Sequence, residues 1–196
     1  MEIKNLLKRF WNFVWHEDSF LSWAVNVVLA FILVKFIIYP LLGFLLGTSY
    51  PVVAVVSCSM EHNTNLGTCS LDHDEFNNWW KKQEDYYNKI DITKDEFSRY
   101  RFANGFNKGD LMVLTKAKTI HRGDIIVFYG NANEPIIHRV VSTNNNYQTK
   151  GDNNIGSRSD EINIGQDRII GKALFRVPYL GWLKVWFNDL INLFLQ

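Results

Sequence analysis

The stretch PVVAVVSCSM, residues 51–60, decides how the rest of the chain is interpreted. Its run of β-branched residues at 52–56 predicts a strand, and this strand leads directly into two serines, Ser57 and Ser59. In an extended segment both hydroxyls lie on one face and the intervening Cys58 points away. A serine becomes a nucleophile only where a base removes its proton and donors receive the oxyanion, so the stretch requires partners elsewhere.

Five further runs rich in β-branched and aromatic residues follow, at 111–115, 124–129, 136–142, 147–150 and 169–177. Short strands separated by Gly, Asn and Asp turns predict a mainly β fold built on an antiparallel β domain. Two of the runs begin with Gly-Asp, at Gly109-Asp110 and Gly123-Asp124. Glycine accepts positive φ and the carboxylate caps the turn, so both aspartates are predicted to be structural.

Residues 20–46 form an apolar stretch whose one charged side chain is Lys35. At about 1.5 Å per residue this stretch crosses a hydrocarbon core of about 30 Å, which predicts an uncleaved, single-pass transmembrane anchor with Lys35 snorkelling to an interface. Three basic residues lie in 1–19, whereas 47–80 contains no Lys or Arg. The positive-inside rule therefore predicts a cytoplasmic N-terminus and a domain on the outer face of a cell membrane.

The length of 196 residues leaves room for the anchor and one domain of about 130 residues. Lys and Arg number 21 against 20 Asp and Glu, without a basic run, which excludes the electrostatic footprint of a nucleic-acid-binding protein. The predicted organisation is a cytoplasmic segment 1–19, the anchor 20–46, a catalytic β domain 47–181 with a helical insertion at about 61–105, and an amphipathic C-terminal helix 182–196.

Four ordered segments supply a recognisable pattern: SCSM at 57–60, IIHRVV at 136–141, KGDNN at 150–154 and FRVPYLGW at 175–182. Together they resemble the type I signal peptidases, peptidase family S26, in the archaeal and endoplasmic-reticulum branch where a histidine replaces the bacterial general-base lysine. The resemblance covers roughly 20–60 and 106–185 and leaves most of 61–105 unmatched.

The resemblance implies a serine endopeptidase with Ser59 as nucleophile and His138 as general base. The backbone N–H of Ser59 and the hydroxyl of Ser57 would receive the oxyanion. The implied substrate is a secretory preprotein that joins the enzyme as an extended strand and is cleaved after a small residue of its signal peptide. The other implied partners are the lipid bilayer and the protein translocation machinery, and no cofactor or metal is required.

The third member of the catalytic group is less clearly marked. The family's second aspartate usually lies six positions beyond the first, but position 158 is Arg158 and the next aspartate, Asp160, lies eight beyond Asp152. Asp152 follows a glycine and precedes two asparagines, a setting that uses a carboxylate in local backbone hydrogen bonds. We therefore expect Asp160 to orient His138 and Asp152 to shape the turn, with an exchange of these roles as the alternative.

Two cysteines, Cys58 and Cys69, lie in the exported region, where either a disulfide or two free thiols is possible and free thiols are predicted. Cys58 stands where the family usually has glycine, and His62 stands where proline is common. A zinc hypothesis involves His62, Cys69, Asp72, His73 and Asp74. Their spacing matches no usual ligand set, so no metal site is predicted.

The unmatched insertion has its own pattern. Aromatic and apolar residues at helical spacing predict a helix within 74–90, and Thr93 with Glu96 predicts a capped second helix ending near Gly105. The helix pair could cover a sheet edge, lie on lipid or grip a substrate. The segment 182–196 is predicted to lie either at the membrane interface or against the β domain.

Two other functions compete with the signal peptidase interpretation. One is a membrane serine protease with a Ser-Lys dyad that uses Lys116, Lys118 or Lys150 in place of His138. The other is a catalytically silent, membrane-tethered β module that binds exported proteins, for which Ser59 would be dispensable.

Overall fold

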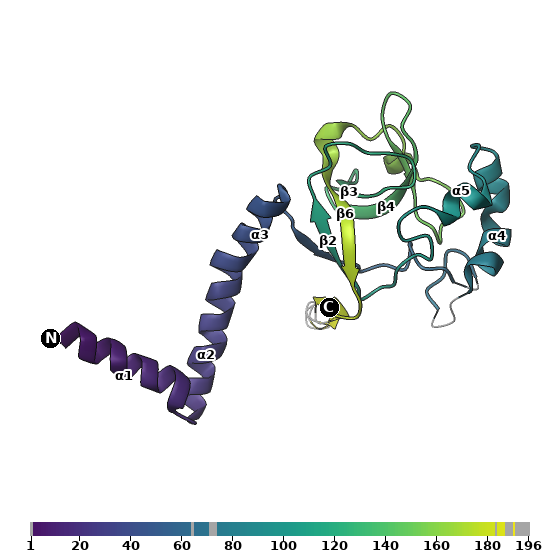
Figure 1. The fold of residues 1–196 in the computed structure, drawn as a ribbon. Helices are drawn as coiled ribbons and strands as arrows, with labels where there is room; N and C mark the ends of the chain where they lie inside the picture. The colour runs from purple at the N-terminus through teal and green to yellow at the C-terminus, as the bar shows by residue number, and fades with distance from the viewer. Residues whose placement is uncertain (1, 64, 71–73, 183, 187–189, 191–196) are drawn as a thin grey trace. The chain divides into compact units, whose positions relative to one another are not determined.

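The computed structural model describes all residues except 1, 64, 71–73, 183, 187–189 and 191–196. The chain divides into two compact units, Met1–Leu45 and Leu46–Gln196. The first unit begins with α1 (Glu2–His16), a helix that the sequence analysis did not predict. It continues through α2 (Phe20–Leu33), a π-helical segment η1 (Val34–Ile38) and α3 (Tyr39–Leu46) (Figure 1).

The predicted anchor is helical from Phe20 to Leu46, a length of 27 residues with a mean hydropathy of 2.5 in its most apolar window. It is long and apolar enough to cross a membrane, as predicted. Ser19 caps its start, because the Ser19 side chain accepts a hydrogen bond from the backbone N–H of Ser22 at 3.1 Å. The ammonium of Lys35 lies 5.6 Å from the ring centroid of Phe31, so this charge contacts an aromatic face within the helix.

The second unit contains one antiparallel sheet of six strands in the order β1-β2-β6-β3-β4-β5. The strands are β1 (Val52–Ala54), β2 (Leu111–Thr115), β3 (Ile125–Tyr129), β4 (Pro135–Ser142), β5 (Gln148–Lys150) and β6 (Ile169–Val177). The prediction of a mainly β domain behind an N-terminal apolar helix is confirmed. Strand β1 ends earlier than predicted, so Ser57 and Ser59 lie in a bend and a turn and not in an extended segment.

Both Gly-Asp turns have the predicted structural chemistry. Gly109 and Gly123 have φ values of 88° and 92°, in the region that favours glycine. Asp110 accepts a hydrogen bond from the backbone N–H of Asn107 at 3.0 Å, and Asp124 accepts one from the backbone N–H of His121 at 2.8 Å. The two aspartates therefore shape the entries to β2 and β3.

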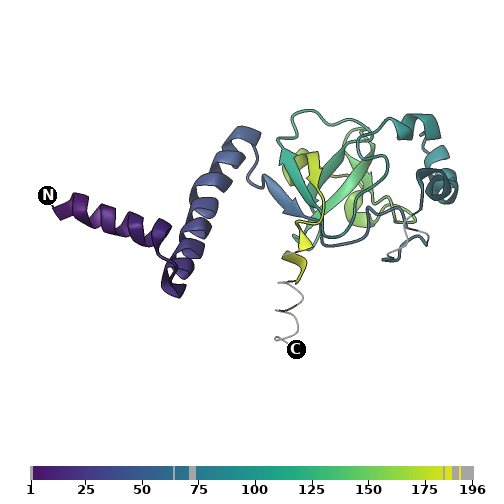
Figure 2. The ribbon, with the colours of Figure 1, turned by 60° about the horizontal axis from the view of Figure 1, so that its bottom comes forward.

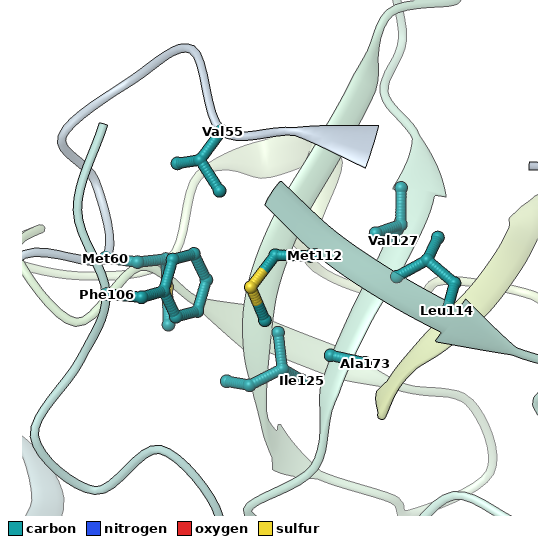
Figure 3. Close-up of a cluster of buried hydrophobic side chains, with 8 residues drawn as sticks. All are labelled: Val55, Met60, Phe106, Met112, Leu114, Ile125, Val127 and Ala173. Atoms are coloured by element: carbon teal, nitrogen blue, oxygen red, sulfur yellow. The ribbon is translucent and has the colours of Figure 1, made fainter. Parts of the chain in front are cut away.

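The main hydrophobic core of the β domain includes residues from both sides of the serine motif in the sequence (Figure 3). Its buried members are Val55, Met60, Phe106, Met112, Leu114, Ile125, Val127 and Ala173. Val55 and Met60 come from the two ends of the segment that carries the serines, and both are at most 1% exposed. Burial of these two side chains anchors the segment on the sheet and leaves the serines between them at the edge of the core.

The insertion builds a second core on α4 (Phe76–Asn88) and α5 (Lys94–Ser98), which lie together on one side of the β domain (Figures 1 and 2). This core comprises Trp79, Trp80, Tyr87, Ile92, Phe97 and Val141, the last from β4. The four aromatic rings of this core are buried and pack with Val141 of β4. They therefore cover the sheet and are not available to lipid or substrate. Thr93 caps α5 as predicted, but α5 ends at Ser98 and not near Gly105.

The predicted helix at 182–196 falls mostly outside the described residues. Among those described, Trp182 and 184–186 are helical, and Val185 is buried. Trp186 is 65% exposed.

The second core yields a stability prediction. Trp80 is 3% exposed, and Trp80→Ala should lower the free energy of unfolding by about 3–5 kcal/mol because it removes buried ring area and leaves a cavity. The matched change Trp186→Ala should cost less than about 0.5 kcal/mol, since that ring is exposed. Urea unfolding of the detergent-solubilised chain measures both, and equal losses would contradict the assignment of the insertion as a buried core.

Candidate active site

Ser59 and His138, 79 positions apart in the sequence, lie within hydrogen-bond distance of each other. His138 lies on β4 opposite Ile126 of β3, is 4% exposed, and holds its Nε2 2.9 Å from the Oγ of Ser59. The Oγ of Ser57 lies 3.1 Å from the Oγ of Ser59. A base is therefore within hydrogen-bond reach of the candidate nucleophile, with a second hydroxyl beside it.

The turn that carries Ser59 is held by the loop 151–154. The carbonyl of Ser59 accepts a hydrogen bond from the backbone N–H of Asn153 at 2.8 Å, and the carbonyl of Cys58 accepts one from the side-chain amide of Asn153 at 3.0 Å. A Cβ at Gly151 would stand 2.7 Å from the carbonyl oxygen of Ser59, so only glycine permits this approach.

The carboxylate that meets His138 belongs to Glu161, a residue that the sequence analysis missed. Its Oε1 hydrogen-bonds to the Nδ1 of His138. Glu161 is fully buried, and its Oε2 accepts a hydrogen bond from the backbone N–H of Arg158 at 2.8 Å. The hydroxyl of Thr149 adds a third contact, at 3.3 Å from Oε1. Ser59, His138 and Glu161 therefore form a continuous chain of hydrogen bonds.

The expected contact between Asp160 and His138 is absent from the described structure. Both acidic residues lie in the 3₁₀ turn Ser159–Glu161, where successive side chains point about 120° apart, so only one of them can face the histidine. The Oδ1 of Asp160 is buried without a hydrogen bond and lies 3.4 Å from the Nε of Arg158. The adjacent position, Glu161, supplies the carboxylate instead.

Asp152 is fully buried against Arg139 and does not touch His138. Its Oδ1 lies 2.8 Å from the Nε of Arg139 and its Oδ2 lies 2.6 Å from a terminal nitrogen of the same guanidinium. Burial would raise the pKa of Asp152, but the charge and hydrogen bonds of Arg139, with a smaller contribution from His62, hold that pKa well below its usual range. Asp152 therefore remains an anion that secures the loop.

Lys150 is buried too, and its ammonium contacts Gly151 and α4. It donates to the carbonyl of Gly151 at 3.0 Å and lies 5.1 Å from the ring centroids of Tyr86 and Tyr87. Burial lowers its pKa to about 7, against the opposing attraction of Asp152 and Glu161. Within the described residues the hydrogen bonds of the Ser59 hydroxyl go to Ser57 and His138, not to a lysine.

His62 belongs to the packing of the insertion. Its ring stacks on Trp79 with centroids 3.7 Å apart, and its Nε2 lies 3.4 Å from Asp152. Burial lowers the pKa of His62. Asp72 and His73 lie outside the described residues, and among the residues that are described no three His, Cys, Asp or Glu side chains gather as metal ligands.

The prediction of two free thiols is wrong, because Cys58 and Cys69 form a disulfide with their Cα atoms 5.4 Å apart. Asn153 explains why they meet. Its side-chain amide donates hydrogen bonds to the carbonyls of Cys58 and Thr68 at 3.0 and 2.8 Å. One amide group therefore holds the serine turn beside the start of the insertion. Cys58 and Cys69 then close the loop between them.

A cleft of about 620 Å³ opens at the two serines and His138. Ala54 and Val56 line one part of it, 135–137 line a second, and 154–156 line a third. Strand β5 pairs with β4 only from Arg139 onward, so the part of β4 that faces the cleft has no β5 partner. Strand β1 is likewise an edge of the sheet.

Helix α4 supports the third wall of this cleft. The side-chain amide of Gln83, itself 1% exposed, donates to the carbonyls of Asp152 and Asn154 at 2.8 and 3.0 Å. The hydroxyl of Tyr86 lies 3.0 Å from the hydroxyl of Ser157. The insertion therefore holds the loop that runs from Asp152 to the cleft wall.

Comparison with known proteins adds two informative relatives. The chain is 30% identical over 97 residues to the signal peptidase complex catalytic subunit SEC11 of Plasmodium falciparum (isolate 3D7), which covers 43% of this chain and 53% of that protein. It is 30% identical over 98 residues to SEC11 of Saccharomyces cerevisiae (strain YJM789), which covers 43% of this chain and 59% of that protein. No protein-family model matches the chain.

These similarities agree with the resemblance to signal peptidases that the motifs indicated. The chain spans about half of the length of the relatives that it matches.

Lys150 yields a prediction on pH. From about pH 7 to its ordinary pKa of 10.5, the unfolded chain holds a proton on Lys150 that the folded chain lacks. Stability should therefore rise with pH across this window, by at most about 1.4 kcal/mol per pH unit. Lys150→Met should abolish the rise, and the exposed Lys118→Met should keep it. Urea unfolding between pH 7 and 9 tests this, and a parallel rise in wild type and Lys150→Met would contradict it.

Proposed function

We propose that this chain is a membrane-anchored serine endopeptidase that removes signal peptides from secretory preproteins, with Ser59 as nucleophile and His138 as general base. The observation that carries the proposal is the 2.9 Å contact between Ser59 Oγ and His138 Nε2 beside a cleft. The similarity to SEC11, named as a signal peptidase catalytic subunit, supports the reaction class.

In the proposed reaction His138 accepts the proton of Ser59 as the hydroxyl attacks the scissile carbonyl. Glu161 is proposed as the positioning carboxylate in place of Asp160, because its contact with Nδ1 fixes the histidine tautomer and stabilises the imidazolium. The backbone N–H of Ser59 and the hydroxyl of Ser57 are proposed to stabilise the oxyanion. His138 then returns the proton to the leaving amine, and water repeats the sequence on the acyl-enzyme.

The cleft suits an extended peptide. The free edge of β1 and the part of β4 that lacks a β5 partner offer backbone groups on two sides of the cleft. This arrangement supports binding of the preprotein as an added strand. Ala54, Val56 and Ile136 give the adjoining surface an apolar lining. This lining supports recognition of small apolar side chains before the cleaved bond.

The proposal includes a location in the cell membrane, with the N-terminus in the cytoplasm and the catalytic domain on the outer face. The basic residues in 1–19 and their absence from 47–80 support this orientation. The relatives are named as subunits of a signal peptidase complex, and by analogy we include the protein translocation machinery among the proposed partners.

The first prediction from this function concerns the catalytic pair. Ser59→Ala and His138→Ala should each lower kcat for cleavage of a model preprotein by several orders of magnitude while the domain stays folded. The double variant should be hardly worse than either single variant, because the two residues act as one unit. Cleavage by purified variants in detergent measures this, and near-normal cleavage by Ser59→Ala would favour the non-catalytic β module. Activity of His138→Ala that requires a lysine would favour the Ser-Lys dyad.

The second prediction separates two adjacent carboxylates. Glu161→Gln should lower kcat by about 10²- to 10⁴-fold with little change in KM, since it removes the anion that stabilises the imidazolium. Asp160→Asn is the matched control and should cleave at nearly the wild-type rate. Loss of activity in Asp160→Asn with full activity in Glu161→Gln would return the role to Asp160.

The third prediction combines the disulfide with the orientation. In sealed, correctly oriented vesicles, a membrane-impermeant maleimide should label Cys58 and Cys69 only from the outer side and only after reduction. Labelling before reduction would argue against the disulfide. Labelling from the cytoplasmic side would reverse the orientation.

A further inference from the structure

The first helix, α1, carries a large apolar face that the chain itself leaves exposed. Ile3, Leu7, Phe10 and Val14 recur at intervals of four, three and four residues, so they lie along one side of the helix. The exposed fractions of Ile3, Leu7 and Phe10 are 76%, 61% and 51%. Leu6 and Trp11 widen this surface, and Trp15 lies beyond its border between Lys4 and Lys8; the exposed fractions of these three side chains are between 59% and 70%.

The opposite side of α1 is polar and basic. Lys8, Arg9, Asn5 and Asn12 lie there with one acidic residue, Glu2, whereas Lys4 lies at the border of the two faces, between Trp11 and Trp15. A helix with one broad apolar face, tryptophans and a basic polar face has the composition of helices that lie in the plane of a membrane interface. Negatively charged headgroups complement its excess of basic side chains.

The end of α1 is joined to the start of the apolar span by side-chain hydrogen bonds. The hydroxyl of Ser22 donates to the carbonyl of Phe13 at 2.6 Å, and the amide of Asn26 donates to the carbonyl of Val14 at 2.9 Å. Carbonyls in the last turn of a helix lack partners within it, and here two side chains of α2 supply them. These hydrogen bonds stabilise the bend at 17–19 (Figure 1), so α1 is a separate helix and not an extension of the span.

The junction between α1 and the span indicates that lipid covers the apolar face of α1. The span begins at Phe20, so the chain enters the hydrocarbon close to that residue, and the last turn of α1 is bonded to the first two turns of the span. The end of α1 must consequently lie near the boundary between lipid and water. Its apolar side chains and tryptophans find a matching environment there without another protein.

We propose that α1 is an in-plane interfacial helix whose apolar face enters the lipid acyl boundary and whose basic face binds anionic headgroups. The proposed partner is a lipid surface that contains anionic headgroups. The inference is independent of the catalytic proposal, because it concerns a surface in the other unit of the chain.

The experiment uses the full chain in lipid nanodiscs with an environment-sensitive fluorophore on a single introduced cysteine, the native pair being closed as a disulfide. Leu7→Cys reports on the apolar face, and Asn5→Cys is the matched control on the polar face. Nitroxide-labelled phosphatidylcholine should quench the probe at position 7 at least twofold more than the probe at position 5. Equal quenching at the two positions would overturn the proposal.

The charge is tested separately in discs of phosphatidylcholine with and without phosphatidylglycerol. Replacement of Lys4, Lys8 and Arg9 by Gln should reduce quenching at position 7 in the discs with phosphatidylglycerol and bring it to the value found in phosphatidylcholine alone. An unchanged value would overturn the anionic preference. Shielding of position 7 from aqueous iodide only in discs that hold two chains would identify a second copy as the partner and overturn the lipid proposal.

Discussion

The buried ion pair between Arg139 and Asp152 organises the β domain. Neither residue is exposed to solvent, and removing either charge would leave the other buried without compensation, which costs about 3–5 kcal/mol in other proteins. Arg139 also donates to the carbonyls of Arg101, Phe102 and Gly123 and lies over the ring of Phe97 at 4.6 Å. One guanidinium therefore joins β4, the loop at Asp152, the insertion and the entry to β3.

Alternation along β4 connects this pair to the chemistry. Because neighbouring residues of a strand point to opposite faces, Arg139 on one side leaves His138 directed to the cleft on the other. The loop that begins at Asp152 continues to Glu161, whose carboxylate meets His138. The ion pair therefore positions both the strand that carries His138 and the start of the loop that carries Glu161.

Two departures from the pattern of the family that the sequence resembles, Cys58 and His62, both contact the insertion. Cys58 bonds to Cys69 at the start of the insertion, and His62 stacks on Trp79 of α4. Helix α4 in turn holds the carbonyls of Asp152 and Asn154 through Gln83. Cys58 and His62 therefore both belong to the interface between the insertion and the segment 151–154, which lines the cleft.

The strands and the span could be predicted from the sequence because β-branched periodicity and apolar length act locally, and the motifs singled out Ser59 and His138. Three features depended on tertiary structure. The 3₁₀ turn at 159–161 directs Glu161, and not Asp160, toward His138. The amide of Asn153 holds the segments of Cys58 and Cys69 together. The polar side chains of α2 bond to the last turn of α1 at the bend. Each is a contact between groups that compete for a partner or lie apart in the sequence. Local residue preferences do not determine which of the available groups form the contact in the folded chain.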